Sequence, residues 1–206
     1  MKDALSVMSA KAENPPASFP LEKKWSYAIA SGGFALLTVV AAKVAIPLPG
    51  TPIPGTLQTL AVLLAGLVLG ARFGALSQAA YLGLGLGGLP VFALPGAGPG
   101  YLFGPTGGYL IGFLAASFLV GTLAPPSDGT GFLRRLLAVA AGIATIHAAG
   151  VLWLGFLSLP SMTDAWRAGS LPFLGFDLAK GVLACALAGA WSRVARVAPW
   201  TNRFSA

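Results

Sequence analysis

Six long apolar segments dominate this sequence and restrict the folds that it can adopt. They cover, in order, residues 25–46, 56–70, 73–89, 105–123, 133–157 and 172–190. A helix that crosses the hydrocarbon core of a bilayer needs about 20 apolar residues. The chain is 56% hydrophobic and 9% charged, whereas a soluble domain has about 25% charged residues. The sequence therefore predicts an all-α integral membrane protein with six transmembrane helices, embedded in a lipid bilayer.

The basic residues predict how these helices are oriented. On one side of the predicted bundle lie Lys2, Lys11, Lys23, Lys24, Arg72, Arg134, Arg135, Arg193, Arg196 and Arg203, whereas the connections on the other side contain Arg167 alone. Because cytoplasmic connections are enriched in Lys and Arg, both termini are predicted to be cytoplasmic. This distribution also explains the net charge of +7 better than nucleic-acid binding does.

The polarity of the chain divides it into three regions. Residues 1–24 are polar and are expected to form a flexible cytoplasmic arm, and residues 25–190 form the transmembrane domain. Residues 191–206 mix aromatic residues with arginines and resemble an amphipathic cytoplasmic tail at the membrane surface. Small residues recur at four-residue spacing in several spans and favour close helix packing. In the first span they leave open a contact to a partner subunit or a second copy of the chain.

A proline-rich stretch before the second span predicts a cavity. Residues 46–70 read IPLPGTPIPGTLQTLAVLLAGLVLG, so four prolines lead directly into an apolar helix that has Gln58 near its start. Proline neither continues a helix nor donates a backbone hydrogen bond. Irregular backbone at membrane depth is tolerated where protein or a water-filled cavity satisfies its polar groups. We therefore expect a ligand cavity at this face of the bundle.

A second long connection lies on the same side of the membrane. Residues 90–108 read PVFALPGAGPGYLFGPTGG and contain no charged residue. Phe92 and Tyr101 belong to this connection, and Tyr109 opens the helix after it. Aromatic side chains provide flat apolar walls, and tyrosine adds a polar tip. We interpret the two connections as a lid over the cavity.

Asp177 and Lys180 are the charges that most strongly indicate a site. Both lie inside the sixth span, three residues apart and therefore on one face of a helix. An isolated charge at the centre of a bilayer costs at least about 2.5 kcal/mol, so both side chains should face the bundle interior. An ion pair that serves packing alone is the alternative. The functional hypothesis is that the ammonium receives a substrate carboxylate and the carboxylate accepts N–H donors.

Several other polar residues have two interpretations each. Gln58 can hydrogen-bond a substrate amide or serve helix packing. Lys43, one turn from the end of its helix, can bind ligand or extend to the membrane interface. His147 is either a proton relay or a core histidine bonded to a neighbour. Asp164 and Arg167 are expected to form an ion pair in a connection.

Signatures of ATP and metal sites are absent from the sequence. It contains no HExxH, CxxC, GxSxG or Walker motif. The pattern of Gly83, Gly85 and Gly88 matches a dinucleotide fingerprint, but it ends a membrane helix and no strand precedes it. We expect no cofactor.

Taken together, these motifs resemble those of one transporter family. The stretches IPLPGTPIPGTLQTLAVLLAGLVLG, YLGLGLGGLPVF, FGPTGGYLIGFLAASFLVG and FLGFDLAKGVL are similar to the BioY family, the biotin-binding S-components of energy-coupling factor (ECF) vitamin transporters. The resemblance is dense over residues 30–124 and resumes at Asp177 and Lys180, which match the family's D-x-x-K signature.

The resemblance implies an ECF S-component fold in a bacterial inner (plasma) membrane. It implies that Lys180 receives the biotin carboxylate and that Asp177 accepts from the ureido N–H groups, with Gln58 nearby and Tyr109 closing the pocket. It also implies partners, namely a membrane coupling subunit and ATPases that supply energy. Two alternatives stay open: an S-component for another vitamin, and an intramembrane enzyme that uses Asp177, His147 or Lys180 as acid or base.

Overall fold

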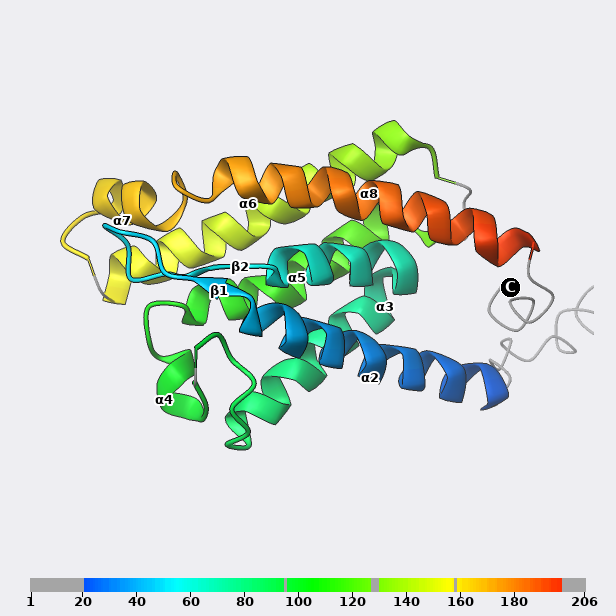
Figure 1. Cartoon of the computed structure of the whole chain (residues 1–206), viewed down its shortest axis with the longest axis horizontal. Helices are drawn as coiled ribbons and strands as arrows, with labels where there is room; N and C mark the ends of the chain where they lie inside the picture. Colours follow the sequence, from blue (N-terminus) through cyan, green and yellow to red (C-terminus); the bar gives the residue numbers. More distant parts are fainter. Residues whose placement is uncertain (1–20, 95, 127–129, 158, 198–206) are drawn as a thin grey trace, which may run out of the picture.

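The computed structural model describes residues 21–94, 96–126, 130–157 and 159–197, and these form an elongated helical bundle (Figure 1). The long helices are α2 (Leu21–Lys43), α3 (Gln58–Leu86), α5 (Gly107–Leu123), α6 (Phe132–Leu157) and α8 (Leu174–Val197). The short elements are β1 (Ala45–Ile46), β2 (Gly55–Thr56), α4 (Pro99–Leu102) and α7 (Met162–Gly169). The all-α prediction is confirmed apart from one two-residue strand pair.

Helix α3 contains both the second and the third predicted spans. Its backbone breaks at Gly70, which has φ 77° and ψ −179°, a conformation that favours glycine. Figure 1 shows the two halves of α3 running in opposite directions from this break. The predicted connection at residues 71–72 is therefore a sharp turn inside one helical element, and Arg72 belongs to the helix.

Four helices are long and apolar enough to cross a membrane. Within the described residues these are Trp25–Lys43, Gln58–Leu86, Phe132–Leu157 and Leu174–Val194, and the shorter Gly107–Leu123 is also apolar. Large apolar side chains such as Ile29, Leu133 and Phe156 are exposed on the outside of the bundle, where a bilayer would surround them. The chain is a multi-pass membrane protein.

Helices α2 and α8 extend beyond the predicted transmembrane domain, into the last residues of the predicted arm and the first residues of the predicted tail. Helix α2 begins at Leu21, four residues before the predicted span, and α8 continues to Val197. Residues 1–20 and 198–206, which make up most of the predicted arm and part of the tail, lie outside the described residues.

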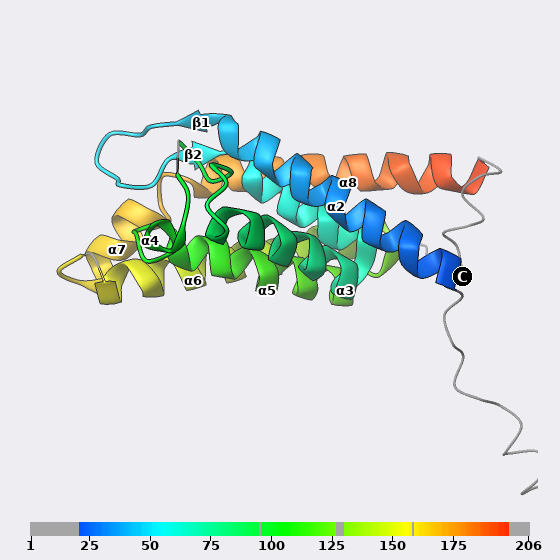
Figure 2. The ribbon, with the colours of Figure 1, turned by 90° about the horizontal axis from the view of Figure 1, so that it is seen from below.

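The irregular elements gather at one end of the bundle. Figures 1 and 2 show β1, β2, α4 and α7 at the end opposite the start of α2 and the end of α8. The proline-rich stretch is the hairpin between β1 and β2, which pair antiparallel with Ala45 opposite Thr56. Pro47 follows β1 directly, and because proline has no N–H the strand pairing stops there. This end also holds Arg167, as the charge distribution predicted.

Helix α7 is an element that the apolar pattern did not predict. It begins at Met162, directly after the N-cap residue Ser161, whose Oγ accepts a hydrogen bond from the backbone N–H of Asp164 (3.1 Å). Ala165 and Gly169 are buried against the bundle, whereas Trp166 and Arg167 are exposed. The helix has only eight residues, too few to stand out as an apolar segment.

Candidate ligand-binding cavity

A cavity lies inside the end of the bundle where the irregular elements gather. It is lined by Ile53, Pro54, Thr56, Gln58, Thr59, Ala93, Tyr101, Thr106, Tyr109, Leu110, Phe113, Ile146, His147, Phe173, Asp177 and Lys180. These residues come from the proline-rich hairpin, from the α3–α5 connection, from four long helices and, for Phe173, from the connection between α7 and α8. The proline-rich stretch and the second connection therefore do border a cavity together.

The first wall of the cavity is charged and belongs to α8. Lys180 Nζ donates to Asp177 Oδ1 (2.7 Å) and to the backbone carbonyl of Thr56 (2.6 Å). Asp177 lies in the first turn of α8, where the helix dipole favours a negative charge, and it is only 5% exposed. The prediction that both charges face the bundle interior is confirmed. Since an ammonium has three donors, Lys180 retains one beyond these two bonds.

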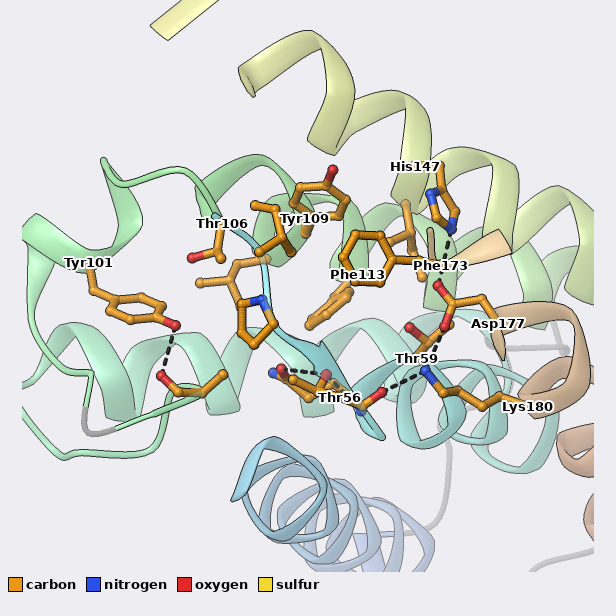
Figure 3. Close-up of a pocket in the computed structure, with 16 residues that line it drawn as sticks. Thr56, Thr59, Tyr101, Thr106, Tyr109, Phe113, His147, Phe173, Asp177 and Lys180 are labelled. Carbon is orange, nitrogen blue, oxygen red and sulfur yellow. Dashed lines mark hydrogen bonds and ion pairs between the residues drawn. The ribbon is translucent and has the colours of Figure 1, made fainter. Parts of the chain in front are cut away.

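His147 extends this charged wall from α6. Its Nε2 lies 3.0 Å from Asp177 Oδ2, and its Nδ1 lies 2.9 Å from Ser170 Oγ. His147 is 3% exposed and lines the cavity beside Asp177, as Figure 3 shows. The interpretation as a core histidine bonded to its neighbours is confirmed. Sequence reasoning nevertheless missed its place at the cavity, although an ionisable residue in the middle of a span was the available signal.

Gln58 lies at the base of the proline-rich hairpin and joins it to α3. Its Nε2 donates to the Tyr81 hydroxyl (2.8 Å), and its Oε1 accepts from Thr56 Oγ1 (3.0 Å). Tyr81 is fully buried and donates onward to the carbonyl of Val91 (3.4 Å). Gln58 therefore lines the cavity and also links three segments of the fold.

Two tyrosines, together with Thr59 and Thr106, form the remaining polar part of the lining. The Tyr109 hydroxyl donates to the carbonyl of Gly169 (2.6 Å), which ties α5 to the end of α7. The Tyr101 hydroxyl donates to the carbonyl of Ala93 (2.8 Å) within the α3–α5 connection. Burial raises the pKa of Tyr101 above its usual range, so its hydroxyl keeps its proton. Figure 3 shows Tyr101 across the cavity from Asp177 and Lys180.

Two residues of the predicted site lie outside the lining. Phe92 is fully buried and stacks on Tyr101 with ring centroids 4.9 Å apart, so it supports the wall from behind. Lys43 directs its ammonium to the carbonyls of Pro90 and Phe92 rather than to the cavity. Phe92 was predicted from its place in the second connection and Lys43 from its place near the end of its helix, but packing directs both side chains away from the cavity.

The expected ion pair between Asp164 and Arg167 does not form. Asp164 Oδ2 instead accepts a hydrogen bond from Ser161 Oγ (2.6 Å) at the start of α7. Among the residues that the structure describes, no salt bridge joins Asp164 to Arg167. The N-cap arrangement directs the carboxylate toward the helix start and away from the next turn.

This lining is suited to an amphipathic ligand with an anionic group. It offers a buried cation, a carboxylate, an amide and hydroxyl donors on walls built mainly from Phe113, Phe173, Ile146 and Leu110. Small-molecule sites combine such apolar walls with a few oriented polar groups. The space left for water-sized molecules is about 50 Å³. Ligand sites have about 300–1,000 Å³, so a wall must shift when a ligand of that size binds.

Comparisons with known proteins give this chain a family and a fold. A model of the BioY family matches residues 15–197. The biotin transporter BioY of Thermotoga maritima is 42% identical over 160 residues, which cover 78% of this chain and 92% of the relative. The biotin transporter BioY of Rhodobacter capsulatus is 40% identical over 169 residues, covering 74% and 85%. The crystal structure of an S-component for biotin from an ECF-type ABC transporter superposes with a TM-score of 0.78 at 26% identity, covering 85% of this chain and 95% of that one.

Proposed function

The chain belongs to the BioY family, and on that premise we propose that it binds biotin and presents it for uptake as the S-component of an ECF transporter. The observation that carries the proposal is the buried cluster of Lys180, Asp177 and His147 on one wall of an otherwise mainly apolar and aromatic cavity. It is a transport subunit and not an enzyme.

The chemistry of biotin matches the polar groups of the cavity. Its carboxylate would take the remaining donor of Lys180 in a charge-assisted hydrogen bond. Its ureido group lies at the opposite end of the molecule and has two N–H donors and one carbonyl acceptor. With the carboxylate on Lys180, this group would meet polar lining residues away from that ion pair, such as Tyr101 across the cavity, while Asp177 would hold the Lys180 ammonium in place. The apolar ring and tail would lie against Phe113, Phe173 and the two tyrosines, Tyr101 and Tyr109.

His147 completes this cluster as a positioning residue. Its hydrogen bond to Asp177 Oδ2 leaves Oδ1 for Lys180, so each carboxylate oxygen has one protein partner. Ser170 holds the other ring nitrogen and fixes the orientation of the ring. The carboxylate is therefore presented to the cavity in one orientation before the ligand arrives, which lowers the ordering cost of binding.

Uptake requires a specific topology and an energy source outside this chain. We assign six transmembrane helices by counting the two halves of α3 separately, with both termini in the cytoplasm and the cavity at the outer face of a bacterial inner membrane. The sequence has no nucleotide-binding motif. A membrane coupling subunit and ATPases would therefore supply the energy, and α2, whose Ile29, Leu36 and Val40 are exposed, offers an apolar face to a partner or a second copy.

Titration of the purified protein with biotin and with biotin amide tests the proposal. We expect tight binding of biotin by calorimetry or tryptophan fluorescence. The amide lacks the free carboxylate, so its affinity should fall by about 10- to 150-fold, the equivalent of a charge-assisted hydrogen bond of about 1.5–3 kcal/mol. Folded protein that binds neither compound would contradict biotin as the ligand, and equal affinity for both would remove the carboxylate contact.

A further inference from the structure

The end of α2 is joined to the α3–α5 connection by one side chain. Lys43, the last residue of α2, donates from Nζ to the backbone carbonyl of Pro90 and to that of Phe92 (2.9 Å). An ammonium has three donors and no acceptor, so it can bind two carbonyls at once. These contacts connect segments 47 and 49 residues apart in the sequence.

The carbonyls that Lys43 binds belong to the backbone that forms the cavity wall. Ala93, the residue after Phe92, lines the cavity and accepts a hydrogen bond from the Tyr101 hydroxyl. Phe92 stacks on Tyr101 and meets Tyr81 edge-on, with ring centroids 5.6 Å apart. A displacement of the backbone at Phe92 would therefore move two lining residues together, Ala93 and Tyr101.

The same backbone contains a strained residue. Leu94 has φ 56° and is the one non-glycine residue with positive φ among those that the structure describes. A leucine in this region persists only when its surroundings hold it there. The contacts that hold the two residues before it include the hydrogen bond from Lys43 to the Phe92 carbonyl and the bond from the Tyr101 hydroxyl to the Ala93 carbonyl.

We propose that Lys43 is a latch that holds the α3–α5 connection closed over the cavity and thereby sets how slowly the ligand leaves. The cavity has little free space, so its wall must move as a ligand enters and departs. Release of two carbonyls by Lys43 frees the strained backbone at Leu94 and, with it, Ala93 and Tyr101. Lys43 acts through this wall and does not touch the ligand. Because Lys43 is the last residue of α2, the position of α2 affects how readily the α3–α5 connection moves away from the cavity.

The first test measures dissociation of biotin and therefore rests on the proposed function. Lys43→Met keeps the length of the side chain and removes its donors, whereas Lys43→Arg retains donors. We expect biotin to leave Lys43→Met roughly 3- to 10-fold faster, a modest effect because one lost bond is exposed and the other only partly buried, and Lys43→Arg to restore the slow rate. Arg167→Met, which removes an exposed charge from the same end, should dissociate like the unaltered protein.

The second test needs no ligand. Ala93→Cys, in a Cys185→Ala background, places a thiol in the wall at a position that is 5% exposed. A water-soluble maleimide should label it faster when Lys43→Met is added, with the same rescue by Lys43→Arg. If the protein fails to bind biotin but this labelling accelerates, the proposed ligand is wrong and the latch stands.

Three results would overturn the latch. Unchanged dissociation and unchanged labelling in Lys43→Met would show that Lys43 does not hold the wall. Loss of discrimination between biotin and biotin amide in that variant, with labelling unchanged, would instead assign Lys43 to the ligand carboxylate. The third result is a lower melting temperature in Lys43→Met that Lys43→Arg fails to restore, while the folded protein keeps wild-type rates of dissociation and labelling. Lys43 would then be a purely structural contact, and the proposal would be overturned.

Discussion

The two halves of the bundle use their buried residues in different ways. The half near the Gly70 break is an apolar core built from Leu63, Leu67, Val120, Ala124, Ala138, Val139, Ile143, Ala184, Cys185 and Ala188. The half near the irregular elements buries Asp177, His147 and Gln58 beside aromatic side chains. One half is held by close packing of small residues and the other by hydrogen bonds between distant segments.

The difference shows how a short membrane protein combines a stable core with a polar cavity. In the packed half, helices approach closely enough that a side chain on Gly121 would collide with the backbone of Gly70 and Ala71. In the cavity half, Asp177, His147 and Gln58 each have a hydrogen-bond partner on another element, because an unsatisfied buried group is costly. Substitutions in the first half should therefore reduce stability, and those in the second should mainly reduce affinity.

The largest expected effect is on stability in the packed half. A Cβ on Gly121 would lie 2.2 Å from the backbone nitrogen of Ala71, which has no flexible end that can move away. We expect Gly121→Ala to destabilise the protein by about 3 kcal/mol, the upper part of the range for overpacking. Thermal unfolding in detergent measures this loss of stability. Gly83→Ala is the matched control, because a Cβ there meets nothing within 4 Å and alanine favours a helix.

The next effect is on affinity, through the charge of Lys180. We expect Lys180→Met to weaken biotin binding by about 10- to 150-fold because the charge-assisted bond to the carboxylate is lost. The change also deprives Asp177 of its cation, so the double variant Asp177→Asn/Lys180→Met should recover stability without recovering affinity. Titration calorimetry measures the change in affinity, and melting temperatures measure the change in stability. Wild-type affinity in Lys180→Met would remove Lys180 from the site.

A smaller effect should follow from His147. His147→Phe keeps a ring in the core but removes the hydrogen bond to Asp177, so we expect affinity to fall roughly 5- to 30-fold, the equivalent of about 1–2 kcal/mol. Ser170→Ala removes only the outer bond of the pair and should cost less. If both variants bind biotin like the unaltered protein, His147 does not position Asp177 for binding. The functional cluster would then consist of Asp177 and Lys180 alone.

The smallest predicted effect concerns Tyr109. Tyr109→Phe removes the hydrogen bond to the Gly169 carbonyl and retains the aromatic wall. We expect the free energy of unfolding to fall by about 0.5–1.5 kcal/mol because this bond is internal to the protein, and affinity to fall by about 2- to 10-fold because the cavity wall is held less firmly. A fall in stability without a change in affinity would place Tyr109 with the packed half rather than with the cavity.

Much of the site was visible in the sequence because the signal was local. The three-residue spacing of Asp177 and Lys180 predicts one helical face, and their charge in an apolar span predicts an interior position; the structure places both on the cavity wall. The prolines before Gln58 similarly marked the hairpin that borders the cavity. These inferences depend on neighbours in the chain and on the cost of burying polar groups in lipid.

The sequence by itself determined the apolar segments, the end at which the irregular connections gather, and the pairing of Asp177 with Lys180 three residues away. Tertiary structure alone decided that His147 meets Asp177 from another helix, that Phe92 supports the wall from behind, and that Lys43 reaches two carbonyls of a distant connection. The physical reason is that periodicity and composition act over a few residues. The rotation of each helix, and hence which side chains meet, depends on how all the helices pack together.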